Sequence, residues 1–121
     1  MVFLTPSDRH ATTLVRAAVV LWGFNILVFA LWYWKLDGGG PVERHRSGYQ
    51  AADFLFPQQV NGQRWKAEFF DYLFVAFTTA TAFSPADTMP LTRTAKGLMM
   101  IEASLSFTII AFLAARAVNI L

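Results

Sequence analysis

The segment from Ala17 to Trp34 reads AAVVLWGFNILVFALWYW and contains no charged residue. As an α-helix it would rise about 27 Å, which is close to the thickness of the hydrocarbon core of a bilayer. Trp32 to Trp34 form an aromatic cluster at its end, and Lys35 follows, a pattern typical of a membrane–water interface. The segment is too long for a signal peptide, and no small-residue cleavage site follows it. We therefore expect a membrane-spanning helix over about residues 15–35.

The composition of the whole chain also indicates a membrane protein. The 121 residues suit one domain, and 55% of them are hydrophobic and 16% aromatic. A small soluble core could not bury 12 Phe and 4 Trp side chains. The net charge of +2 comes without a run of basic residues, so we expect no nucleic-acid partner. We expect an all-α membrane fold over residues 1–121, surrounded by a lipid bilayer.

A second long apolar segment runs from Gly97 to Ala115 and is followed by Arg116. Thr92 precedes it and is a suitable N-cap residue. We therefore expect a second spanning helix over about residues 95–119. Small residues recur on one face of this helix and predict a packing face, because they let helices approach closely in lipid. They are Ser104, Thr108, Ala111 and Ala115.

The connection between these helices begins at Gly38-Gly39-Gly40-Pro41, which predicts the end of the first helix. Residues 36–66 are mostly polar, and a connection of this length suggests some short helix. The apolar patch Phe54-Leu55-Phe56-Pro57 either rests on the membrane surface or packs on the helices.

Residues 67–83 form a third apolar segment, which reads AEFFDYLFVAFTTATAF. The uncharged run between Asp71 and Ser84-Pro85 is too short to cross a bilayer comfortably. We expect a re-entrant half-helix over about residues 69–82, whose broken end must be covered by protein or water. A third, tilted spanning helix is the alternative interpretation.

The predicted order of spanning helix, half-helix, extended return over residues 82–92 and spanning helix resembles a two-transmembrane potassium-channel pore domain. In that family a Thr-rich helix end runs into the filter T-V-G-Y-G-D, followed by P-x-T and a basic residue. Thr81 matches the Thr before the filter and Asp87 the Asp after it. Pro90 to Thr92 match P-x-T, and Lys96 matches the basic residue. The resemblance covers roughly residues 69–118 in pattern.

The filter positions depart from the family, because residues 82–86 read AFSPA. Ser84 and Ala86 replace the two glycines, and Pro85 fixes its own backbone, so a standard potassium filter cannot form. Any pathway is expected to be weakly selective for monovalent cations. The resemblance implies these candidate pore-lining residues: Thr78, Thr81, Ala82, Phe83, Ser84, Pro85, Ala86 and Asp87.

Three functions remain open: a cation pore with a different filter, a pore-like but non-conducting scaffold or accessory subunit, and a helical subunit of a larger membrane complex without pore ancestry. We expect a homo-oligomer, with a tetramer favoured, because one copy has too few helices to shield a re-entrant segment. The resemblance further implies a multi-pass protein of the plasma or inner membrane with both termini cytoplasmic.

Besides the small hydroxyl residues, one carboxyl and one amide side chain lie well inside the predicted spanning helices. Glu102 is a functional candidate, because an unpaired carboxylate in hydrocarbon is costly. Alternatively it pairs with Arg93 or Lys96, or lies close enough to the interface to stay hydrated. Asn25 is expected to hydrogen-bond between helices.

Enzymatic chemistry has no support in the sequence. The chain has no cysteine, and its two histidines are far apart, so we expect neither a metal site nor a cofactor. It shows no Ser-His-Asp arrangement, no paired catalytic carboxylates and no phosphate-binding glycine loop. We therefore expect that the protein is not an enzyme.

Overall fold

The computed structural model describes residues 6–46, 53–60, 65, 67–82 and 88–120. In chain order its elements are α1 (Pro6–Leu36), the 3-10 turn η1 (Asp37–Gly39), α2 (Pro41–Arg46), β1 (Phe54–Leu55), α3 (Pro57–Val60), α4 (Phe69–Ala82), β2 (Met89–Pro90) and α5 (Arg93–Ile120). The fold is mostly helical, and the predicted pair of long apolar helices with a short apolar helix between them is confirmed.

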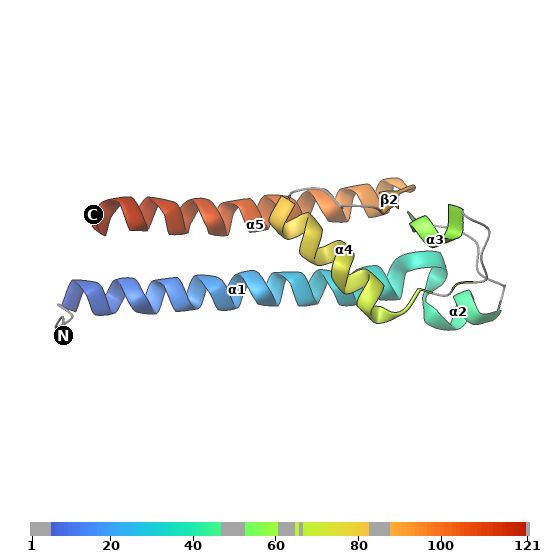
Figure 1. The fold of residues 1–121 in the computed structure, drawn as a ribbon, viewed down its shortest axis with the longest axis horizontal. Helices are drawn as coiled ribbons and strands as arrows, with labels where there is room; N and C mark the ends of the chain where they lie inside the picture. Colours follow the sequence, from blue (N-terminus) through green and yellow to red (C-terminus); the bar gives the residue numbers. More distant parts are fainter. Residues whose placement is uncertain (1–5, 47–52, 61–64, 66, 83–87, 121) are drawn as a thin grey trace.

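The two long helices set the shape of the molecule. Two segments are long and apolar enough to cross a membrane: Thr12–Gly39, which comprises most of α1 together with η1, and Arg93–Arg116 of α5. α1 and α5 run in opposite directions, so the start of α1 and the end of α5 lie at the same end of the molecule (Figure 1). At the other end lies the cap, a name we give to residues 37–46, 53–60 and 88–92. α4 begins near the cap and runs obliquely to about halfway along α5 (Figure 1).

The ends of the long helices follow from local chemistry. α1 begins at Pro6, before the start near residue 15 that was expected for the spanning helix, and proline suits a first helical position. It stops before Gly38, Gly39 and Gly40, whose φ angles of 63°, 83° and 108° are left-handed and favour glycine. α5 begins after Thr92, whose Oγ1 accepts a hydrogen bond from the Ala95 amide at 3.2 Å. Thr92 is therefore the N-cap that the sequence predicts.

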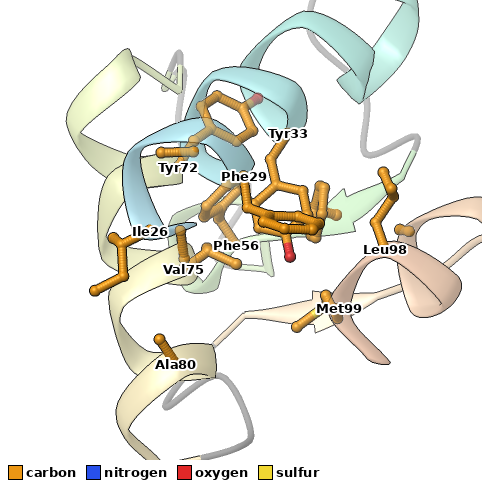
Figure 2. Packing of buried hydrophobic residues seen from close by; sticks show 13 residues of the cluster. Ile26, Phe29, Tyr33, Phe56, Tyr72, Val75, Ala80, Leu98 and Met99 are labelled. Carbon is orange, nitrogen blue, oxygen red and sulfur yellow. The ribbon is translucent and has the colours of Figure 1, made fainter. Parts of the chain in front are cut away.

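The hydrophobic core lies where α1, α4, α5 and the cap meet (Figure 2). Phe54 and Phe56 of the cap are almost fully buried. The Phe54 ring lies 5.3 Å from the Tyr33 ring of α1, and the Phe56 ring lies 5.4 Å from the Tyr72 ring of α4. The apolar patch at residues 54–57 thus packs on the helices, which was one of its two predicted positions. The remaining core side chains are Ile26, Phe29, Ala30, Val75, Ala76, Ala80, Ala95, Leu98 and Met99.

A small antiparallel pairing corrects the expectation of a purely helical fold. Phe54 pairs with Pro90 and Leu55 with Met89. The Leu91 amide adds a hydrogen bond of 2.8 Å to the carbonyl of Asp53. Strands of two residues leave no alternating pattern in the sequence, so periodicity could not indicate them. The pairing returns the chain after α4 to the cap.

Candidate functional site

A chain of hydrogen bonds joins the three main helices near the end of α4. The Trp22 Nε1–H of α1 donates to Ser106 Oγ of α5 at 2.9 Å, and Ser106 Oγ donates to the carbonyl of Ala80 in α4 at 2.7 Å. The last carbonyls of a helix lack partners inside it, and fully buried Ser106 supplies one here. Ser106 lies about 20 Å along α5 from Arg93 and about 15 Å before Arg116. The end of α4 therefore lies near the middle of the apolar part of α5.

The threonine hydroxyls of α4 bond within their own helix. Thr78 Oγ1 donates to the carbonyls of Phe74 and Val75, at 3.0 and 3.1 Å. Thr81 Oγ1 donates to the Phe77 carbonyl at 2.8 Å. Thr78 is buried, whereas Thr81 is exposed on the surface of the single chain. Of the candidate pore-lining residues, Thr78, Thr81 and the backbone of Ala82 are described, and residues 83–87 lie outside the described residues.

One face of α4 is only partly covered by the described residues. Phe70, Phe74 and Phe77 are 73%, 43% and 47% exposed, and Thr81 continues the same face at helical spacing. The opposite face carries the buried Tyr72, Val75 and Thr79. α4 is thus apolar on both sides. On the exposed face, the Phe77 ring contacts the Trp22 ring of α1, with the ring centres 6.2 Å apart.

Glu102 lies fully buried between α5 and α1. Its Oε1 accepts a hydrogen bond of 2.7 Å from the Tyr33 hydroxyl, and its other oxygen, Oε2, has no hydrogen-bond partner in the part of the chain that the structure describes. The partner is therefore Tyr33 rather than Arg93 or Lys96, whose side chains are exposed. Asn25 Nδ2 donates to the backbone carbonyl of Glu102 at 3.4 Å, a contact between helices of the predicted kind.

The cap is built around the buried carboxylate of Asp37, which sequence reasoning missed. Its Oδ2 accepts from the Tyr72 hydroxyl at 2.5 Å, and its Oδ1 accepts from the amides of Asp53 and Phe54 at 3.0 and 3.2 Å. A carboxylate at the end of the first apolar segment, directly before a glycine run, was the available signal, but partners so distant in sequence could not be inferred from it.

Two further side chains close the cap. Asp53 accepts from the Gly38 amide at 3.0 Å and from the Thr92 hydroxyl at 2.7 Å, and so ties the end of α1 to the start of α5. Arg44 donates to the backbone carbonyls of Trp34 and Asp37 at 2.8 and 2.6 Å, and its guanidinium lies 5.0 Å from the centre of the Tyr72 ring. The cap thereby fixes the relative positions of all three main helices at this end.

A groove of about 410 Å³ lies between α1 and α5, with no α4 residue among its lining. Its walls are apolar apart from Asn25, which also contacts Glu102. The lining consists of Leu21, Phe24, Asn25, Val28, Phe29, Trp32, Ile101, Leu105 and Ile109.

Comparisons with known protein families, with curated proteins and with solved structures find no match to this chain. Within the described part of the chain, no three acidic or histidine side chains gather closely enough to hold a metal ion. Function must therefore be argued from the geometry of the helices and from the buried polar contacts.

Proposed function

We propose that the chain is a two-span membrane protein in which α4 is re-entrant, and that copies of it assemble into a weakly selective pore domain for monovalent cations. α1 and α5 are the spanning helices of this proposal. α4 enters the bilayer from the cap side and ends at mid-depth. The chain that follows it returns to the cap side. This is the arrangement of the pore domains that the sequence resembles.

The position of the end of α4 is the main support for the proposal that this helix is re-entrant. The Ala80 carbonyl is held by Ser106 near the middle of α5, whereas Met89 is paired with Leu55 in the cap. A chain that starts at the cap, reaches mid-length and returns to the cap within so few residues enters and leaves on one side. A third spanning helix would instead place Met89 at the opposite end of the molecule.

The exposed apolar surface supports insertion in lipid. Val20, Phe24 and Met100 are 69%, 63% and 70% exposed, and they lie on the two long helices. Soluble monomers rarely leave such contiguous apolar surface uncovered. Lipid and neighbouring copies of the chain would cover it.

Assembly into an oligomer is supported by what one copy leaves uncovered. Irregular backbone at membrane depth is tolerated only against protein or water, and the described residues of α1 and α5 cover the face of α4 with Phe70, Phe74 and Phe77 only in part. The predicted packing face of α5 is also exposed within the single chain, with Ser104 and Thr108 on it. A ring of copies, with four favoured, would enclose the ends of the α4 helices around an axis.

The chemistry of that axis would favour cations. The C-terminal end of a helix carries a partial negative charge, and α4 ends at mid-depth. Asp87, repeated in each copy, would add negative potential at the mouth. The sequence AFSPA at residues 82–86 lacks the glycines of a carbonyl filter, so potassium would not be preferred over sodium.

The same AFSPA sequence favours the second candidate, a pore-like scaffold or accessory subunit that does not conduct. In that case α4 would serve to pack copies or partner subunits together. Conduction separates the two candidates, whereas the membrane topology is common to both.

Topology is tested with single cysteines, for which the chain offers a clean background because it has none. Glu68→Cys, Met89→Cys and Val118→Cys each place a thiol on an exposed side chain. Membrane-impermeant maleimide should label positions 68 and 89 from one side and position 118 from the other. Labelling of positions 68 and 89 from opposite sides would show that α4 spans the membrane.

Conduction is tested by sodium, potassium and chloride flux in liposomes that contain the purified chain. We expect sodium and potassium to permeate at similar rates and chloride much more slowly. Asp87→Asn should weaken the preference for cations, whereas Glu68→Gln, an exposed position before α4, should leave it unchanged. Strong potassium selectivity would refute the filter argument, and no flux under any condition would favour the scaffold.

A further inference from the structure

The Glu102 carboxylate is buried without a compensating positive charge from the described residues. Its side chain is 0% exposed, Oε1 accepts from Tyr33, and Oε2 has no partner among the described residues. Arg93 and Lys96 precede it on the same helix, but their side chains are exposed. The described surroundings thus offer one neutral donor to a group that carries a full negative charge when ionised.

The described elements around this carboxylate supply no positive charge either. α1 presents Tyr33 and Asn25, which are both uncharged. The buried side chains of α4 include no charged group, and neither does buried Phe54 of the cap. An ionised carboxylate in such surroundings costs several kcal/mol unless a counter-charge or further hydrogen bonds compensate it.

We propose that Oε2 of Glu102 is a binding site for a small cation, either a proton or an alkali-metal ion, inside the contact between α1 and α5. A proton needs only the one free oxygen. An alkali-metal ion would use the same oxygen and would need further oxygen ligands, which water can supply. Both provide the positive charge that the described side chains lack.

Asn25 lies next to the site. It donates to the backbone carbonyl of Glu102 and also lines the groove of about 410 Å³ between α1 and α5. It is the polar residue of this otherwise apolar groove, whereas the Glu102 side chain is not part of the lining. The inference rests on the proposed function only in that α1 and α5 cross a bilayer, and it does not require conduction.

Infrared difference spectroscopy tests the site on the full chain in lipid vesicles. Spectra of the wild type and of Glu102→Gln are compared in sodium, potassium and choline salts. If a proton is bound, the wild type shows a carboxylic-acid C=O band that Glu102→Gln removes, the same in all three salts. If an alkali-metal ion is bound, the wild type shows a carboxylate band that shifts when choline, which is too large for the site, replaces sodium or potassium.

Two further variants secure the assignment. Tyr33→Phe removes the hydrogen bond to Oε1 and should shift the Glu102 band without removing it, which identifies the band even if Glu102→Gln does not fold. Glu68→Gln, at an exposed carboxyl, should leave the band unchanged. A Glu102 carboxylate band that is identical in all three salts would overturn the inference alone. A chain that does not insert into the vesicles, as shown by cysteine labelling, would overturn the proposed function and this inference together.

Discussion

Ser106 acts at the scale of a single residue, because one hydroxyl connects three helices. It accepts from Trp22 and donates to the Ala80 carbonyl. Ser106→Ala would leave a buried carbonyl and an indole N–H without partners. We expect the free energy of unfolding in mixed micelles to fall by about 1–3 kcal/mol.

The matched control is Thr94→Ala on the same helix, where the hydroxyl-bearing side chain is exposed. A surface change of this kind should alter the free energy of unfolding by less than about 0.5 kcal/mol. Equal losses for the two variants would mean that the hydrogen bonds of Ser106 do not hold the end of α4.

Asp37 is a second residue on which several segments depend. Asp37→Ala removes the acceptor of the Tyr72 hydroxyl and of two cap amides, and should cost about 3–5 kcal/mol in free energy of unfolding. Tyr72→Phe removes one of these bonds and leaves the carboxylate in place, so about 1–2 kcal/mol is expected. Denaturant titration of both variants measures the two losses in free energy of unfolding, which can then be compared. A Tyr72→Phe loss as large as that of Asp37→Ala would show that the amide bonds contribute little.

At the scale of elements, the turn after α1 depends on its glycines. Gly40 has a φ of 108°, and a Cβ added there would lie 3.1 Å from the Lys35 carbonyl. Gly40→Ala should therefore cost about 1–3 kcal/mol, measured by thermal unfolding in detergent. Gly23 lies inside α1 with nothing within 4 Å of an added Cβ, so Gly23→Ala should be neutral or stabilise by up to about 1 kcal/mol. If Gly23→Ala were less stable than Gly40→Ala, the result would contradict the described turn.

Elements with strong local signals were predictable from the sequence. An uncharged run flanked by aromatic residues predicted α1, Thr92 predicted the start of α5, and the glycine run predicted the end of α1. Contacts between distant segments were not predictable. The bond from Tyr33 to Glu102 and the bonds from Asp37 to Tyr72 and Phe54 depend on how the helices pack, and such partners leave no pattern in one sequence. For the same reason, the pairing of β1 with β2 could not be predicted.

At the scale of the whole molecule, the exposed face of α4 leads to a prediction about assembly. Native mass spectrometry from lipid nanodiscs should show a homo-oligomer, with a tetramer favoured, because the uncovered Phe70, Phe74 and Phe77 need protein beside them if the end of α4 lies at membrane depth. Phe74→Ala should shift the distribution towards monomer. Phe112→Ala, an exposed change on the far half of α5, is the control. A folded monomer as the main wild-type species would contradict the prediction.

The start of α1 and the end of α5 lie at the same end of the molecule (Figure 1). Two copies can therefore be encoded as one polypeptide, with a short linker from the α5 of the first to the α1 of the second. If α1 and α5 span the membrane as proposed, both copies keep the same orientation without an additional crossing segment. Such a concatemer fixes the stoichiometry through the gene, and it allows one altered subunit to be placed among native ones.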